Sequence, residues 1–131
     1  MSDPLTVELV AADRTVWSGE AGMVIARTTE GEIGVLPGHA PVLGVLVEGA
    51  VQIRQTDDQV VVAAVHGGFL SIADNTVAIL AEQVELAADI DLERARQALA
   101  RATGETDDDD DGPAARQRAE ARIRASELAA S

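Results

Sequence analysis

Apolar and polar residues alternate in short runs over the first part of the chain. From Leu5 to about Leu86 these runs are rich in valine and isoleucine, and turn residues interrupt them about every eight to twelve positions. In LTVELV, Leu5 and Val7 alternate with Thr6 and Glu8, which predicts a strand with one inward face. The pattern predicts a mainly β N-terminal sandwich or barrel of about ten short strands.

Glycines mark two of the predicted turns. Glu48-Gly49 separates VLGVLV from AVQIRQ, in which Val51 and Ile53 are expected to face one side of a strand. His66-Gly67-Gly68 separates VVVAAV from FLSI. The two adjacent glycines predict a bulge or bend at this break. Phe69, which follows them, is expected to enter the core.

After Asp89 the spacing of apolar residues becomes helical. The repeat predicts a short helix whose apolar stripe consists of Leu92, Ala95, Leu99 and Ala102. Asp91 is predicted to be the N-cap of this helix, and Gly104 is predicted to be the residue just past its end. The stretch GETDDDDDGP follows, and its consecutive aspartates repel one another, so residues 104–112 are predicted to form a solvated linker.

A second helix is predicted to begin at Pro113, because proline is favoured at the first helical position. The chain therefore divides into a β-sandwich domain, 1–88, and a C-terminal α-helical hairpin, 89–131. A two-helix arm cannot build a core of its own, so it must dock on the sandwich or on another protein. Its larger apolar side chains are expected to anchor it; these are Leu92, Leu99, Ile123 and Leu128.

The charge balance excludes several kinds of partner. The formal net charge is −13, which disfavours nucleic acid and anionic lipid. There is no cysteine and there are only two histidines, so neither a disulfide framework nor a metal site is expected. No run approaches the roughly 20 apolar residues that span a bilayer, so direct membrane insertion is not expected and the chain is expected in the cytoplasm.

Two other classes of function fit the sequence less well. An enzyme needs a nucleophile, a base or a metal constellation, and Ser18, His39 and His66 show no such spacing, so no catalytic residue is assigned. A free-standing β-sandwich binding module with a helical tail remains an alternative. Such modules usually present aromatic platforms, whereas this chain has one Trp, one Phe and no Tyr.

The segment GEIGVLPGHAPVL, residues 31–43, combines glycines, prolines and a histidine in an otherwise aliphatic stretch. Gly34 and Gly38 permit tight backbone paths, and Pro37 and Pro41 stiffen the segment. A stiff loop of this kind suits a contact with another subunit. On the residues alone, a rigid corner of the sandwich in which His39 is a satisfied side chain is the favoured alternative.

Three segments together carry a family resemblance. EGEIGVLPGHAPVL (30–43), HGGFLSIADNTVAILAE (66–82) and IDLERA (90–95), in this order and spacing, resemble the epsilon subunit of the bacterial F-type ATP synthase. The resemblance extends from about Leu5 to Ala102. It implies a β-sandwich followed by a helical hairpin. It also implies a non-catalytic subunit at the foot of the rotating central stalk, bound to the gamma subunit and the c ring and able to restrain ATP hydrolysis.

The resemblance also implies a place and a contact surface. The subunit would lie at the cytoplasmic face of the cell membrane as a peripheral part of the complex, and its C-terminal helices would reach the alpha and beta subunits. The loop that holds Glu32 would face the c ring, and His39 would lie near gamma. The residues implied in subunit contact are Glu32, Pro37, Gly38, His39 and Pro41.

IDLERA matches a motif that takes part in binding regulatory ATP in some members of the family. The matching positions are Ile90, Asp91, Arg94 and Ala95. Asp91 would accept a hydrogen bond from the nucleotide and Arg94 would supply positive charge; the alternative is an N-cap and a surface cation. No glycine-rich phosphate loop occurs, so the nucleotide would be regulatory and no cofactor is required. The second helix is short, about 27 Å, so its reach into the catalytic head is limited.

Overall fold

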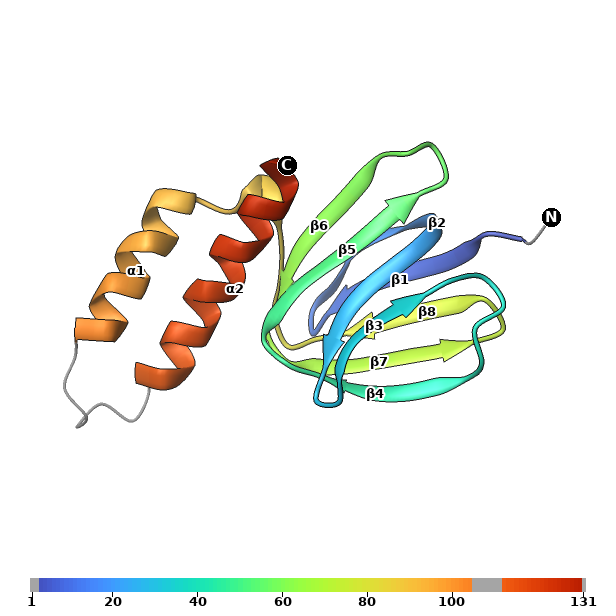
Figure 1. The fold of residues 1–131 in the computed structure, drawn as a ribbon, viewed down its shortest axis with the longest axis horizontal. Helices are drawn as coiled ribbons and strands as arrows, with labels where there is room; N and C mark the ends of the chain where they lie inside the picture. Colours follow the sequence, from blue (N-terminus) through green and yellow to red (C-terminus); the bar gives the residue numbers. More distant parts are fainter. Residues whose placement is uncertain (1–2, 105–111, 131) are drawn as a thin grey trace.

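The computed structural model describes residues 3–104 and 112–130. Its β part precedes its helical part, as Figure 1 shows. The strands are β1 (Leu5–Ala11), β2 (Arg14–Thr28), β3 (Gly31–Val35), β4 (Val42–Leu46), β5 (Gly49–Gln55), β6 (Val60–Val65), β7 (Gly68–Ala73), β8 (Thr76–Leu80) and β9 (Val84–Leu86). A 3₁₀ turn, η1 (Ala87–Asp89), leads into α1 (Leu92–Gly104), and α2 (Gly112–Ala130) ends the described chain.

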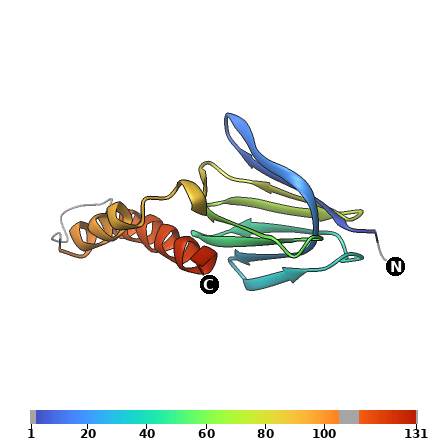
Figure 2. The same ribbon diagram turned by 90° about the horizontal axis from the view of Figure 1, so that it is seen from above.

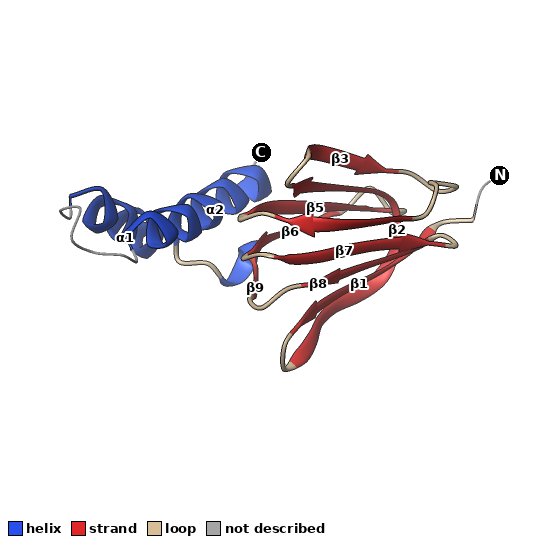
Figure 3. Cartoon of the chain, turned by 90° about the horizontal axis from the view of Figure 1, so that it is seen from below, coloured by secondary structure: helices blue, strands red, loops and turns tan. Residues whose placement is uncertain are grey.

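The nine strands in the described residues form one sheet that folds over itself into a sandwich. The hydrogen-bonded order is β1-β8-β7-β4-β2-β5-β6-β9, with β3 added to β2 and a further pairing of β1 with β2. One layer holds β4, β7 and β8, and the other holds β5, β6 and β9; β1 and β2 connect the two (Figure 3). The predicted fold class is confirmed, with nine strands.

The core lies between the two layers and follows the predicted alternation. Leu5, Val7 and Leu9 are fully buried, and Val51 and Ile53 are buried on β5. The strand count differs from ten because Arg14–Thr28 is one long strand, with one register shift in its pairing with β1 and another, between Ala21 and Met23, in its pairing with β5. Such an irregularity lets one strand serve both layers.

The expectation that Phe69 enters the core is wrong. Its side chain is 54 % exposed, whereas its neighbour Leu70 is fully buried. The glycine break before it is present, and Gly67 and Gly68 have φ of +73° and +127°. A Cβ on Gly68 would lie within 2.1 Å of the Leu80 carbonyl oxygen. This close approach sets the phase of β7, so Phe69 points outward and Leu70 inward.

The two helices pack side by side at one end of the sandwich (Figures 1 and 2). The predicted N-cap of α1 is present, because the Asp91 carboxylate accepts a hydrogen bond of 3.1 Å from the backbone N–H of Arg94. Most of the predicted linker, residues 105–111, lies outside the described residues. No helix in the described ranges is both long and apolar enough to cross a membrane.

The arm docks through alanines, which differs from the expected leucine and isoleucine anchors. On α2, Ala121 and Ala125 are buried against Val62 and Ala64 of β6. Of the expected anchors, Leu128 joins this contact at its edge, and Leu92, Leu99 and Ile123 are only half-buried. Small side chains allow a helix to approach the sheet closely, which explains why larger residues do not occupy the contact.

Candidate functional site

The loop between β3 and β4 is a stiff turn at the end of the sandwich far from the helices. The His39 N–H donates to the Leu36 carbonyl oxygen at 3.1 Å, with Pro37 and Gly38 between them. Gly38 has φ of +86°, and this Pro-Gly arrangement is that of a type II turn. The Gly38 N–H also donates to the Asn75 side-chain oxygen at 2.7 Å. The loop is thereby fixed to the turn between β7 and β8.

Glu32 does not belong to that loop, contrary to the sequence interpretation. It lies on β3, directly across from Arg27 of β2, in the hairpin at the helical end of the sandwich. The segment 31–43 is therefore a strand followed by a loop. Glu32 lies at one end of the sandwich, and Pro37, Gly38, His39 and Pro41 lie at the other (Figure 1).

An apolar stripe, which the sequence analysis missed, covers the outer face of the layer that holds β4, β7 and β8. Val45 pairs with Phe69, and Phe69 pairs with Leu80. All three side chains are about half exposed, and Leu43 on the same face is 77 % exposed. The signal was present in β4 and β7, where apolar residues occupy both phases of the strand and only one phase can face the core.

The IDLERA residues line one hollow of about 320 Å³ at the base of the arm. Ile90, Asp91, Arg94 and Ala95 are brought together there. The sequence analysis missed the other lining residues, which come from β9, η1 and both helices: Glu85, Asp89, Ala98, Arg101 and Arg122. Arg101 lies two turns after Arg94 on α1, a spacing that would have placed both on one face.

A row of charged and polar side chains joins the sandwich to α2 beside this hollow. Arg122 of α2 donates to both carboxylate oxygens of Glu85, from Nε at 2.9 and 3.0 Å, and its Nη2 lies 2.8 Å from Oε1. Behind Glu85 lies His66, the one buried polar or charged side chain among the described residues. Its Nδ1 is 2.6 Å from Glu48 Oε2, and its Nε2 is 3.4 Å from Glu85 Oε1.

The charges around Glu85 set its protonation. Burial raises the pKa of this carboxyl group, but the hydrogen bonds and positive charge of Arg122, together with His66, outweigh burial. The pKa of Glu85 therefore lies below the usual value of a glutamate. When the arm is docked, Glu85 is ionised near neutral pH. Its carboxylate accepts charge-assisted hydrogen bonds from Arg122.

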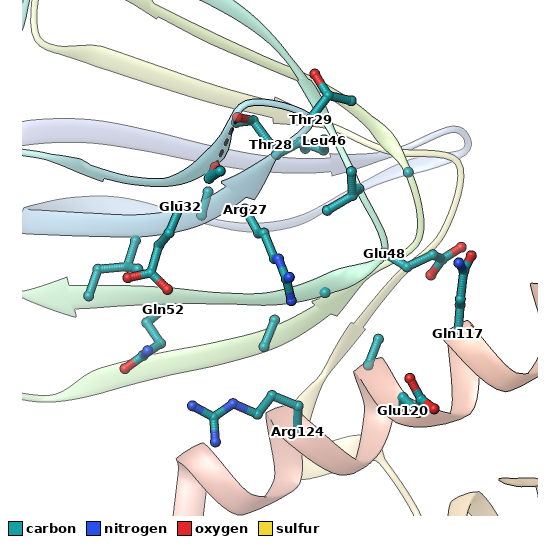
Figure 4. Close-up of a pocket in the computed structure, with 18 of the residues that line it drawn as sticks. Arg27, Thr28, Thr29, Glu32, Leu46, Glu48, Gln52, Gln117, Glu120 and Arg124 are labelled. Carbon is teal, nitrogen blue, oxygen red and sulfur yellow. Dashed lines mark hydrogen bonds between the residues drawn. The ribbon is translucent and has the colours of Figure 1, made fainter.

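A second, larger groove of about 1130 Å³ separates α2 from β2 and β5. Arg27 and Arg124 face it from opposite sides, while Glu32, Glu48 and Glu120 line it as well (Figure 4). Charges of both signs are interspersed along its walls. Within the described residues no group of His, Cys, Asp and Glu side chains could hold a metal ion.

The fold and these surfaces define a β-sandwich subunit with a docked helical arm. A family model described as "ATP synthase, Delta/Epsilon chain, beta-sandwich domain" matches residues 4–87. The "ATP synthase epsilon chain" of Streptomyces avermitilis is 58 % identical over 125 residues, which cover 95 % of this chain and 97 % of that one.

Solved structures share the fold at lower identity. A chain of the Euglena gracilis mitochondrial ATP synthase gives a TM-score of 0.74 at 24 % identity, covering 95 % of this chain and 78 % of that chain. A chain from the central stalk and c-ring structure of the Tetrahymena thermophila mitochondrial ATP synthase gives 0.62 at 18 % identity, covering 99 % and 98 %.

The chain belongs to the family of ATP synthase epsilon chains, which are non-catalytic subunits of that enzyme. The family resemblance of the three sequence segments is confirmed, and the alternative of a free-standing binding module is set aside.

Proposed function

We propose that the chain is a coupling subunit of the central stalk, with its sandwich, residues 1–88, bound to the gamma subunit. The apolar stripe carries this proposal, because contiguous exposed apolar side chains on one sheet face are typical of a protein contact. The loop that holds Pro37, Gly38, His39 and Pro41 borders the stripe, since Leu43 follows it by two residues. Loop and stripe together form one surface for gamma.

The c ring would meet a different part of the sandwich. Glu32 is exposed on the hairpin of β2 and β3, where a carboxylate can pair with basic residues on polar loops of the ring. This hairpin is held by side-chain bonds of Thr28, whose hydroxyl donates to the Gly31 carbonyl oxygen at 3.0 Å. In this arrangement the chain lies at the cytoplasmic face of the membrane as a peripheral subunit.

The arm, residues 89–131, would act as a regulator of ATP hydrolysis. The hollow at its base presents Arg94, Arg101 and Arg122, which suit the phosphates of a regulatory ATP. A nucleotide there would touch both helices and β9, so its binding would favour the docked arm. An undocked arm would be available to the alpha and beta subunits and would restrain hydrolysis.

Binding of the isolated chain to purified gamma tests the proposed surface. Phe69→Ser removes the central side chain of the stripe, and we expect it to weaken binding by at least about thirtyfold, as for an interface hot spot. Val60→Ser is the matched control, because Val60 is also about half exposed but lies on β6, outside the stripe. Equal affinities of the two variants for gamma would rule out the stripe as the contact.

A further inference from the structure

The loop between β3 and β4, residues 36–41, has little packing to hold it in place. Leu36 is 55 % exposed, and Gly38, Ala40 and Pro41 are exposed as well. A Cβ on Gly38 would project into open space, with no heavy atom beyond its chain neighbours within 4 Å. Because a surface loop with few buried contacts opens easily, the conformation of this loop depends on its hydrogen bonds.

One hydrogen bond joins this loop to another part of the sandwich. The Gly38 N–H donates to Asn75 Oδ1 at 2.7 Å. Of the described residues outside the loop, Asn75 alone forms a hydrogen bond with residues 37–40. The donor belongs to the central peptide of the turn, between Pro37 and Gly38. Type I and type II turns differ by a flip of this peptide, and Pro-Gly is compatible with both. The bond to Asn75 therefore selects type II, in which Gly38 has its φ of +86°.

Asn75 is itself held in a defined conformation. Ala73 pairs with Thr76, so Asp74 and Asn75 are the two residues of a hairpin turn, with φ of +50° and +59°. Positive values at both positions are those of a type I′ turn, in which asparagine is favoured. The Asn75 carbonyl oxygen also accepts a hydrogen bond of 2.8 Å from the Thr6 N–H of β1. The side-chain acceptor therefore lies on a turn that β1, β7 and β8 anchor together.

We infer that Asn75 is a positioning residue for the gamma contact, whose side chain holds the loop of residues 36–41 in the turn that gamma binds. The inference rests on the proposed gamma surface and adds to it a residue that acts through the loop. Without the bond to Asn75, the peptide between Pro37 and Gly38 is free to flip between the two turn types. Gamma must then order the loop when it binds, and that ordering lowers the affinity.

Backbone amides report the order of the loop in the full-length chain without gamma. Asn75→Gly keeps the left-handed backbone of the hairpin turn and removes the acceptor. We expect the NMR order parameters of Gly38 and His39 to fall from about 0.85 to below about 0.6, or relaxation dispersion to develop if the flip is slower. Asp74→Gly is the matched control, because Asp74 has the same left-handed backbone and forms no hydrogen bond with the described residues of the loop. If neither measure changes in Asn75→Gly, the inference is overturned.

Binding of the same chains to purified gamma shows whether this order matters. We expect Asn75→Gly to weaken binding by about threefold to tenfold, the effect of one ordinary hydrogen bond, and Asp74→Gly to bind like the wild-type chain. Asn75→Asp should restore binding, because its carboxylate accepts the same bond and aspartate tolerates the left-handed backbone. Salt at about 0.5 M screens the charges that the aspartate variants add or remove.

Two variants of the surface itself separate this inference from the proposed function. If His39→Ala and Phe69→Ser weaken gamma binding but Asn75→Gly does not, the surface stands and the positioning role is wrong. The role is also wrong if Asp74→Gly weakens binding as much as Asn75→Gly, or if Asn75→Asp does not restore it, because the loss would then come from the hairpin turn. If neither His39→Ala nor Phe69→Ser weakens binding, the gamma surface is wrong and the inference falls with it.

Discussion

Two of the three arginines that line the hollow at the base of the arm form no ion pair with another described residue when the arm is docked. Arg122 is held by Glu85, but neither Arg94 nor Arg101 has an ion pair in the described residues. Both lie on α1 and line the same hollow. The hollow is also lined by Asp89 and Asp91, but the two arginines without an ion pair favour an external anion, and a nucleotide phosphate fits the hollow's proposed role.

Equilibrium binding of ATP to the isolated full-length chain tests this arrangement. We expect Arg94→Ala to weaken ATP binding by about tenfold or more, because a hydrogen bond to a charged group contributes about 1.5–3 kcal/mol. Arg54→Ala is the control, since Arg54 is exposed on β5 and does not line the hollow. Absence of ATP binding, or equal loss in both variants, would refute the nucleotide site.

At the scale of the element, α2 is held by small contacts and one ion pair. Ala121 and Ala125 bury little more than a methyl group each, and a buried carbon of this kind contributes about 0.8 kcal/mol. The Arg122–Glu85 pair adds a contact that is partly open to solvent. Docking of the arm is therefore weak compared with the folding of the sandwich, which suits an element that changes position.

A larger side chain in the α2 contact should release the arm. Ala125→Leu inserts extra carbons where Ala125 is fully buried against β6, and overpacking of this kind typically costs about 1–3 kcal/mol. Ala129→Leu, one turn further along an exposed face, should leave docking unchanged. The chain has no cysteine, so spin labels on Thr56→Cys of the sandwich and Glu127→Cys of α2, two exposed positions, report the distance between the sandwich and α2. Identical distances in the two alanine variants would contradict the tight contact.

The sequence predicted the elements better than their contacts. The alternation in LTVELV predicted the β-sandwich, and the helical repeat after Asp89 predicted the helices. Both predictions succeed because the period of buried residues along a strand or helix follows from backbone geometry. The phase of β7 depended on how closely Gly68 approaches Leu80, so Phe69 was assigned to the wrong face. The largest apolar side chains of the arm were expected to anchor it. The short distance between α2 and β6 leaves room only for alanine, and that distance depends on the tertiary structure, which the sequence pattern does not show.

At the scale of the whole molecule, the two outer faces of the sandwich differ. At one end of the sandwich α2 packs against β5 and β6, and the layer of β4, β7 and β8 carries the apolar stripe. The main core lies between the layers and includes no helical residue. Removing the arm thus leaves the core and the proposed gamma surface in place, while exposing the small contact around Val62 and Ala64.

A chain that ends at Ala88 should therefore fold, bind gamma and support ATP synthesis in the reconstituted enzyme. If the arm restrains the reverse reaction, the same truncation should raise ATP hydrolysis relative to the full-length chain at equal incorporation. ATP at ten times its dissociation constant can shift docking by only about 1.4 kcal/mol, roughly tenfold, so the truncation should exceed any effect of added nucleotide. Equal hydrolysis rates would remove the regulatory role and leave coupling alone. A truncated chain that fails to fold would place the division between the two parts elsewhere.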